Sequence, residues 1–471
     1  MTAADHGRTG EVRRPLSPME RWYWICDQLS PLNVVARVRV AGAYRAEDLR
    51  RAAARLAREH PLLRVAVAAE PDGGRPRFVA ARAAGLPVRA VRADGPDADR
   101  WAREVDEVEL ATPLDWRVGP LARIVDVARG APGTADERHD LILTVSHVVA
   151  DGTTALELLR RLVELAAGEA TPGAPAGEAT PRAPVPPAEA LLPGRLNGVP
   201  RAAHLVAAVL ADRVAAVVAR PWRLAPAVPV APTARRTRLV RRELDAGQLA
   251  ALVDRCRRER VTVHGALAAA LATAVAGTEP HRRPRRVCVG SPVDFRAELV
   301  PPVDRRDAGA YVATVPSYLR VGPAADLWTV ARAAFRDLRR RRRLHHHLAL
   351  VSLLRLMSPR SVGASARAVA LVDRAGPGNV CLSNVGRFDF PARVGSWELS
   401  GAQFVAGVSV SGYLVATVNT SHAALHWNFT YIDGAVTGER AGRIADEAVR
   451  ALLSSLRREG APLPTGTGGR S

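Results

Sequence analysis

A histidine followed four residues later by an aspartate and a glycine is the strongest chemical signal in this sequence. His147 comes directly after the largely apolar run 140–146, and Asp151 and Gly152 follow it. Apolar residues on both faces of that run predict a central strand that ends at the histidine. A rigidly held imidazole with a pKa near neutrality suits removal of a proton from a hydroxyl or an amine. Gly152 permits a sharp turn and a close approach of backbone or substrate.

Alternating strand and helix patterns surround this motif and must position it. The chain therefore predicts a mixed α/β fold, and an all-α or all-β fold is excluded. The expected strands are 36–40, 63–68, 77–81, 121–127, 140–146, 237–243, 287–293, 379–383 and 405–411, with a hairpin at 414–420 and 424–431. The expected helices are 46–58, 97–110, 153–167, 202–219, 246–258, 261–275, 327–343 and 438–457.

The length of the chain, 471 residues with 48% hydrophobic side chains, is too great for one ordinary core and predicts two lobes. A Pro-, Ala- and Gly-rich stretch at 168–193 indicates the linker between them. We therefore expect a first lobe over 1–193, a crossover over 194–230, a second lobe over 231–460 and a disordered tail over 461–471.

The charge balance is strongly basic, with a formal net charge of +20 and no lysine. A basic surface favours acidic partners such as a phosphopantetheine carrier domain, the phosphates of coenzyme A or an anionic lipid surface. No recognition motif accompanies the charge, so a nucleic-acid partner is not predicted. The polar N-terminus lacks the apolar core of a signal peptide, and Asp212 and Arg213 interrupt the apolar helix 202–219. A cytoplasmic monomer is expected, and membrane association is compatible with the basic surface but not predicted.

Several further segments resemble, in the same order along the chain, motifs of the condensation-domain superfamily. The segment Ser146–Gly152 resembles the His-His-x-x-x-Asp-Gly signature of that group, which includes nonribosomal peptide condensation domains, chloramphenicol acetyltransferase, wax ester synthases and mycobacterial polyketide-associated acyltransferases. The stand-alone, phthiocerol dimycocerosyl transferase-like members are the most similar. The other matching segments are Pro15–Glu20, Glu59–Arg64, Val263–Leu267, Pro292–Arg296, Leu382–Gly386 and Asn428–Tyr431.

The resemblance implies two chloramphenicol acetyltransferase-like lobes, each a mixed sheet flanked by helices, around a central channel. It implies that His147 deprotonates an acceptor nucleophile that attacks a thioester carbonyl. Asp151 would be structural and would pair with Arg296 from the second lobe, with Asp294 bracing the same loop. Such a pair is physically reasonable because an unpaired buried carboxylate is costly.

An oxyanion also requires hydrogen-bond donors, and the candidates are Ser383, Asn384 and the backbone near Gly152, although the two side chains also fit turn residues at a strand end. Ser146 and Ser409 are further oxyanion or substrate candidates. Ser409 and Ser411 are candidates for lining the channel, although alternating Ser and Val also describes an ordinary strand. The sequence departs from the family at Ser146, where the first histidine of the doublet is usual. That position supports rather than performs catalysis in the family, so its loss argues modestly against a standard peptide condensation domain.

Other chemically suggestive residues receive plainer interpretations. Three consecutive histidines, His345–His347, would point in three directions on a helix and make a poor metal site, so no metal is predicted. The run Arg339–Arg343 is either a solvated helix face or a docking site for an acidic carrier protein. His264 and His422 are expected to be packing residues. The four cysteines lie far apart in sequence and predict no zinc or redox pair.

The sequence therefore predicts a stand-alone acyltransferase of natural-product or lipid biosynthesis that makes an ester or an amide. Its cosubstrate would be a thioester on a carrier protein or coenzyme A, with no bound cofactor. One alternative is a wax ester or diacylglycerol synthase, which predicts long-chain acyl-coenzyme A and a membrane. A second is a relative without catalytic activity that only binds a carrier protein, and a third is a nucleic-acid binder.

Overall fold

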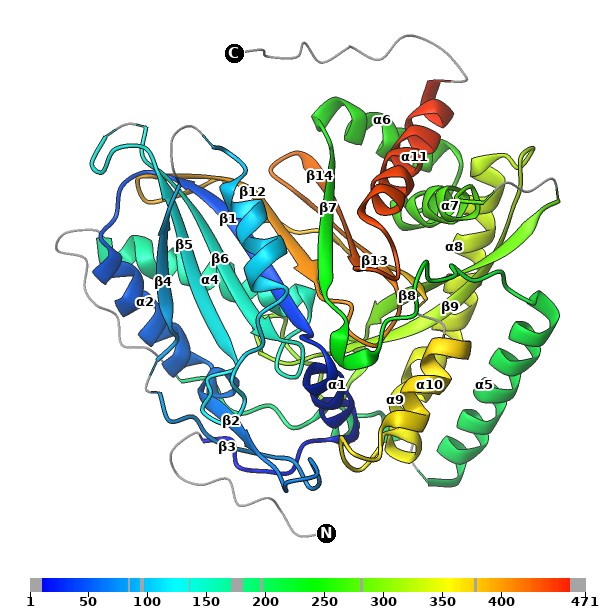
Figure 1. Ribbon diagram of the computed structural model, residues 1–471, viewed down its shortest axis with the longest axis horizontal. Coiled ribbons are helices and arrows are strands. Elements are labelled where there is room, and N and C mark those ends of the chain that lie inside the picture. Colours follow the sequence, from blue (N-terminus) through cyan, green and yellow to red (C-terminus); the bar gives the residue numbers. More distant parts are fainter. Residues whose placement is uncertain are drawn as a thin grey trace.

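The computed structural model describes residues 11–83, 85–93, 97–134, 136–170, 181–194, 198–279, 283–376 and 379–457. The expected disordered tail and the middle of the expected linker lie outside these residues. Within them the chain forms two large mixed sheets flanked by helices, as predicted (Figure 1). The sheets lie side by side, and each has its own hydrophobic core.

The first sheet carries the strand that leads to His147 at its centre. Its strand order is β11-β12-β1-β6-β5-β4, so β6 is bordered by β1 and β5 and its side chains are covered on both faces. All nine residues of β6 except the first are buried, which explains the continuous apolar run. The strands are β1 (Asn33–Ala41), β4 (Val88–Arg92), β5 (Ala122–Arg129), β6 (Arg138–Ser146), β11 (Arg393–Val394) and β12 (Trp397–Ala406).

The second sheet has the order β7-β14-β13-β10-β8-β9. Strand β10, near the centre, is parallel to both of its neighbours: it pairs with β13 along most of its length and with β8 at one position, where Cys381 lies opposite Gly290. A separate hairpin of β2 (Val65–Ala68) and β3 (Arg77–Ala80) lies beside the first lobe. The second-sheet strands are β7 (Thr237–Leu244), β8 (Arg285–Asp294), β9 (Val312–Val321), β10 (Val380–Arg387), β13 (Leu414–Ser421) and β14 (Ala424–Ile432).

Helices cover the outer faces of both sheets and bridge the two lobes. Helix α4 follows the His147 turn and packs on β1, β6 and β12, with α2 outside it. The small-residue helix α7 is almost entirely buried between α8, α11 and the second sheet. The helices are α1 (Pro18–Leu29), α2 (Ala46–Glu59), α3 (Arg100–Arg103), α4 (Gly152–Ala170), α5 (Gly198–Ala219), α6 (Ala246–Arg258), α7 (Val263–Ala276), α8 (Leu327–Arg343), α9 (His346–Met357), α10 (Ala366–Ala375) and α11 (Gly438–Arg457).

The predicted division of the chain into two sequential lobes is wrong in one respect. Strands β11 and β12 come from the second half of the sequence but complete the first sheet, where β12 pairs with β1. The segment 393–406 therefore belongs structurally to the first lobe. The strand expected over 405–411 is instead the end of β12 followed by a turn. The helix expected over 97–110 is a short α3 that continues as a π-helical turn, Glu104–Glu109.

Side chains of the second sheet hold β12, the strand exchanged into the first sheet, in place. Asn428 Nδ2 donates to the carbonyl oxygen of Phe404 at 3.2 Å, and Asn419 Nδ2 donates to that of Ala402 at 2.9 Å. Thr417 donates to the Phe404 carbonyl at 3.0 Å. These polar side chains satisfy backbone groups of β12 that no strand pairs with on that edge. The two lobes are thus joined by an ordered polar seam as well as by the chain itself.

Candidate active site

His147 lies at the carboxyl end of β6, in a turn between that strand and α4. Its backbone N–H donates to the Leu32 carbonyl at 3.0 Å, which continues the β1–β6 ladder by one step. The side chain is half-buried. Nδ1 is buried and has no hydrogen-bond partner among the described residues. Because the side chain as a whole is only half-buried, Nε2 is the ring nitrogen that we expect a reactant to approach.

The ring of Tyr23, from α1, stacks on the imidazole of His147. The two ring centroids are 4.3 Å apart and the planes differ by 7°. The phenol hydroxyl donates to the carbonyl of Val312 in the second lobe at 3.4 Å. Because the stack restricts rotation of the imidazole, Tyr23 fixes its orientation. The aromatic run at 22–24 gave no sign of this role, since stacking across 124 positions of sequence leaves no local pattern.

The protonation state of His147 suits a general base. Burial lowers its pKa below the usual 6.5, and the Asp151 carboxylate and the backbone of His147 and Ala150 oppose that shift without cancelling it. A lowered pKa keeps the imidazole neutral at neutral pH, with a lone pair available to accept a proton.

The structure brings Asp151 and Arg296 together across the lobes, as the resemblance implied. Arg296 Nη2 lies 2.9 Å from the Asp151 carboxylate, and the two side chains are 3% and 2% exposed. The same carboxylate accepts the backbone N–H groups of Thr154 and Tyr311, each at 2.9 Å. Asp151 therefore caps the start of α4 and fastens the loop before β9 to it. Asp294 braces the guanidinium from its other side at 3.0 Å.

Charge compensation keeps this buried pair ionised. Burial alone would raise the pKa of Asp151, but the positive charge of Arg296 and three hydrogen bonds outweigh it and hold the pKa below its usual 3.8. Burial likewise opposes the charge on Arg296, and the carboxylates of Asp151 and Asp294 outweigh it and raise the pKa of the guanidinium. The ring of Tyr311 lies against the guanidinium, 4.7 Å from centroid to Cζ. The pair is a rigid support for the turn that carries His147.

Gly152 is required by packing rather than by a special backbone angle. Its φ does not lie in the left-handed region, and it is the first residue of α4. A Cβ at this position would lie 2.5 Å from Cε2 and 2.7 Å from Cδ2 of Phe404. Phe404 is on β12, so the second half of the chain also contacts the turn that carries His147 through this side chain. The expected turn role is wrong, and close approach of a neighbouring side chain is the reason for glycine.

Ser383 and Asn384 lie on β10, at the sheet edge that also carries Arg296. Strands β8 and β10 are parallel, so their carboxyl ends meet at one edge. The Asn384 Oδ1 accepts the Gly386 N–H at 2.7 Å, which orients the amide. Among the described residues the Nδ2 of Asn384 and the hydroxyl of Ser383 make no hydrogen bond, so both remain available as donors. Neither is bonded to His147, and their part in oxyanion stabilisation stays a prediction.

The other three serines singled out in the sequence, Ser146, Ser409 and Ser411, make structural contacts. Ser409 is fully buried and donates to the Cys26 carbonyl at 2.8 Å, and its φ is +49°. It ties the turn after β12 to α1, so the expectation that it lines a channel is wrong. Ser146 is also buried, and its hydroxyl lies 3.4 Å from the N–H of Val148 inside the catalytic turn. Ser411 donates to the Val408 carbonyl at 2.6 Å.

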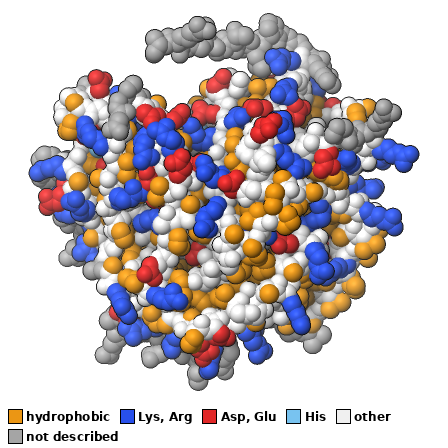
Figure 2. Space-filling view, viewed as in Figure 1, with side chains coloured by type: hydrophobic (Ala, Val, Ile, Leu, Met, Phe, Trp, Pro, Cys, Tyr) orange, Lys and Arg blue, Asp and Glu red, His pale blue; other side chains and the backbone are white. Residues whose placement is uncertain are grey.

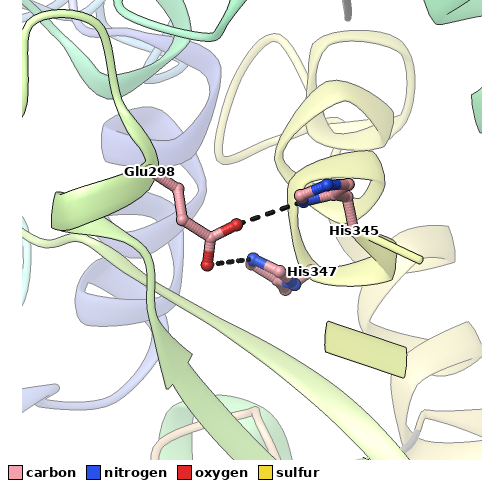
Figure 3. A group of neighbouring side chains, drawn as sticks. All are labelled: Glu298, His345 and His347. Atoms are coloured by element: carbon pink, nitrogen blue, oxygen red, sulfur yellow. Dashed lines mark hydrogen bonds and ion pairs between the residues drawn. The ribbon is translucent and has the colours of Figure 1, made fainter. Parts of the chain in front are cut away.

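The histidine run after α8 is arranged differently from the prediction. His345 has left-handed backbone angles, φ 50° and ψ 32°, and precedes α9, so it is not on the helix with its neighbours. Its Nδ1 and the Nε2 of His347 both point at the carboxylate of Glu298, at 3.2 and 2.9 Å (Figure 3). His346 points elsewhere, with Nδ1 3.6 Å from Asp212 of α5. The argument that three consecutive histidines diverge on a helix is therefore wrong for two of the three.

The remaining sequence candidates have structural contacts. His264 Nε2 is hydrogen-bonded to Ser291 at 2.9 Å, and burial lowers its pKa to about 4. His422 occupies the turn between β13 and β14 and donates to the Pro391 carbonyl at 3.1 Å. In the arginine run, Arg341 is 2% exposed and pairs with Asp212 and Asp337, while its neighbours are exposed. The run is therefore only partly a solvated face.

A depression of about 830 Å³ is present elsewhere, between α7, α8 and α11 of the second lobe. Arg255, Trp328 and Arg443 are among the residues that line it. His147 is not among them, so the depression does not belong to the candidate active site.

The second lobe matches a known family in sequence. Residues 233–432 match the profile of the family described as phthiocerol/phthiodiolone dimycocerosyl transferase C-terminus. A search of curated proteins finds no match to this chain.

The whole chain has the same fold as several solved structures. Polyketide synthase associated protein 5 from Mycobacterium tuberculosis is 18% identical, with 96% of this chain and 100% of that chain covered and a TM-score of 0.64. The first condensation domain of the calcium-dependent antibiotic synthetase is 17% identical, with 96% and 99% covered and a TM-score of 0.69. The TRI3 trichothecene 15-O-acetyltransferase from Fusarium sporotrichioides is 13% identical, with 94% and 95% covered and a TM-score of 0.73. The two-lobed fold predicted from the sequence is confirmed.

Proposed function

We propose that this chain, which has the two-lobed fold of the condensation-domain and chloramphenicol acetyltransferase-like superfamily, is an acyltransferase that uses His147 as its general base. The observation that carries the proposal is the position of His147. Its half-buried imidazole lies on a turn held by a buried ion pair between the lobes. The match of the second lobe to the dimycocerosyl transferase family supports acyl transfer as the reaction class.

The proposed reaction transfers an acyl group from a thioester to a hydroxyl or an amine. Nε2 of His147 removes the acceptor proton while the acceptor oxygen or nitrogen attacks the thioester carbonyl carbon. The tetrahedral intermediate carries an oxyanion, for which the Asn384 amide and the Ser383 hydroxyl are the proposed donors. When the intermediate collapses, the C–S bond breaks and the leaving thiolate takes the proton from the imidazolium. The products are an ester or amide and a free thiol, and the histidine is neutral again.

The roles of the surrounding residues follow from their contacts. Tyr23 and the backbone bond to Leu32 hold the imidazole in place. Asp151 and Arg296 hold the turn and do not touch the reacting atoms in this scheme, so both are positioning residues. The donor is proposed to be a thioester of a phosphopantetheine carrier protein or of coenzyme A, because both present the same thiol and an acidic surface that fits a net charge of +20.

The test is product formation from a panel of acyl-carrier and acyl-coenzyme A thioesters with alcohol and amine acceptors, detected by mass spectrometry. Wild type should give an acylated product with at least one pair, and His147→Ala should reduce kcat/KM by about 10²–10⁴-fold. Ser146→Ala is the matched control in the adjacent position and should retain most of the activity. Undiminished product from His147→Ala, with its fold confirmed by circular dichroism, would reject the proposed base.

A further inference from the structure

Glu298, His345 and His347 converge on one point outside the proposed active site. Glu298 ends a short 3-10 turn, Arg296–Glu298, and the histidines lie at the start of α9 (Figure 3). One oxygen of Glu298 is 2.9 Å from His347 Nε2 and the other is 3.2 Å from His345 Nδ1. The three ligand atoms of the group lie within 4.8 Å of one another. Two imidazoles and one carboxylate are ligands that zinc accepts in proteins.

The spacing of these atoms is close to what a tetrahedral ion requires. Zinc bonds of about 2.0–2.2 Å imply ligand atoms about 3.3 Å apart in a tetrahedron. The two His–Glu separations already lie within about half an ångström of that value. A metal ion would therefore replace the two hydrogen bonds with modest rotations of the side chains. The side chains of His345 and Glu298 keep 30% and 24% of their surface exposed, which provides an entry path and room for a water ligand.

The backbone at His345 is the feature that makes the group possible. A histidine with φ of +50° is uncommon, and this angle takes the residue off the helix so that its ring faces the same carboxylate as that of His347. His346 is directed to Asp212 on the other side. The chain therefore contains its own control: three adjacent histidines, of which two face the group and one faces away.

We propose that Glu298, His345 and His347 bind one divalent transition-metal ion, with Zn²⁺ as the best chemical fit. The ion would join α9 to the turn that begins with Arg296, two residues before Glu298. Its role is structural, because no contact places the group at His147. The proposal is independent of the acyl-transfer reaction.

The experiment is titration of Co²⁺ into the tag-free, chelator-treated full-length chain, followed by visible absorption and by competition with Zn²⁺. Wild type should bind one equivalent and show the intense spectrum of a four-coordinate site. His345→Ala should weaken binding at least tenfold, and Glu298→Gln should do the same. His346→Ala should bind as wild type does.

Three results would overturn the proposal. These are no stoichiometric binding by wild type, unchanged binding by His345→Ala, or an equal loss in His346→Ala, which would mean that the run binds metal without the group. His345 is partly exposed, so its variant is expected to fold even where one at the fully buried His347 does not.

A different observation supports a second inference, which concerns α5. This helix is long and apolar enough to cross a membrane, yet only 11% of its apolar stretch is buried in the protein. Its exposed apolar residues recur every three or four positions and share one face. They are Val206, Leu210, Val214, Val217 and Val218, each more than half exposed.

The opposite face of α5 is fastened to the second lobe. Asp212 pairs with the buried Arg341 of α8, and His204 Nε2 is hydrogen-bonded to the His345 carbonyl at 3.3 Å. Ala208 and Ala219 are buried on the same side. A helix anchored along its length cannot cross a bilayer without losing these contacts. The exposed face can therefore meet a membrane only in the plane of its surface.

The positive charges around the exposed apolar face of α5 indicate which kind of surface this face binds. Arg213 is exposed on α5 and Arg220 directly after it, and most of the run Arg339–Arg343 is exposed on α8, whose Arg341 pairs with Asp212 of α5. In Figure 2 hydrophobic and basic side chains are interspersed at the lower right, where Figure 1 places α5. Apolar residues with surrounding arginines are the pattern of a helix that lies at an anionic lipid interface. We infer that α5 docks this chain on an anionic bilayer.

The test is flotation of the full-length chain with vesicles of phosphatidylcholine alone or with phosphatidylglycerol added. Binding is expected to the anionic vesicles and to fall with salt, and the triple variant Val206→Ser, Leu210→Ser, Val214→Ser should lose at least tenfold. Val300→Ser, at an equally exposed apolar side chain outside α5, is the control and should bind as wild type does. Absence of binding by wild type, or a stable dimer in solution that the triple variant abolishes, would refute the lipid surface.

Discussion

Removing the carboxylate of Asp151 is the perturbation that most directly tests how the site is held. In Asp151→Ala the Arg296 guanidinium, 3% exposed, keeps only the partly exposed Asp294 as a counter-charge. The backbone N–H groups of Thr154 and Tyr311 lose their acceptor at the same time. Breaking one side of a buried pair costs about 3–5 kcal/mol. Since a folded domain is stable by about 5–15 kcal/mol, we expect a large drop in the free energy of unfolding.

The double variant separates the two parts of this loss. Arg296→Ala together with Asp151→Ala removes the uncompensated charge, although the two N–H groups stay without their acceptor. The double variant should therefore be less destabilised than the sum of the single variants, with a coupling energy of about 2 kcal/mol. Asp151→Asn keeps an acceptor oxygen and the shape of the side chain, and it should lie between wild type and Asp151→Ala.

The assay is urea unfolding followed by tryptophan fluorescence, with kcat/KM measured on the folded fraction of each variant. A cost below about 1 kcal/mol for Asp151→Ala, or additive single and double variants, would refute the view that the pair supports the catalytic turn. Full activity of a folded Asp151→Asn would show that the charge itself has no part in positioning.

Three further predictions follow from the site. Because the pKa of His147 is lowered from 6.5, kcat/KM should fall on acidification with its midpoint below pH 6.5, as the imidazole becomes protonated; a midpoint at or above pH 6.5 would contradict this. Gly152→Ala should destabilise the protein by about 1–3 kcal/mol through its clash with Phe404, and Phe404→Leu should recover part of that loss in thermal unfolding. Tyr23→Ala should lower kcat/KM at least tenfold, and Tyr23→Phe, which keeps the stacked ring, should restore it in the same steady-state assay.

The parts of the fold that the sequence predicted are those with strong local periodicity. The amphipathic helices α2, α6, α8 and α11 and the hairpin β13–β14 lie within about one residue of their expected bounds. Most of strand β12 was missed because Ser400, Gly401 and Ala402 interrupt the alternation of apolar and polar residues that begins at Trp397–Leu399. Its membership of the first sheet depends on pairing with β1, more than 350 residues earlier, which no local pattern encodes.

The residues of the candidate site also fall into those that a local motif marks and those that only tertiary contacts bring into the site. His147, Asp151 and Arg296 were found because a motif marks them, and the structure brings the last two into contact. Tyr23 was missed because its role depends on a tertiary contact. The interpretation of the histidine run was wrong because it assumed a regular helix at His345, and no local pattern indicates the left-handed backbone of that residue.

The catalytic turn is a product of both halves of the chain. From the second half of the sequence, Arg296 neutralises Asp151, and Phe404 fills the space that Gly152 leaves open. Phe404 is itself held by side chains of the second sheet, since Asn428 and Thr417 both donate to its carbonyl. The native geometry of the His147 turn therefore depends on the second sheet and on the pairing of β12 with the first sheet. The position of the proposed base is therefore coupled to the docking of the two lobes. This coupling explains why the contacts that support the turn are buried and charged, although His147 itself needs to present only one nitrogen.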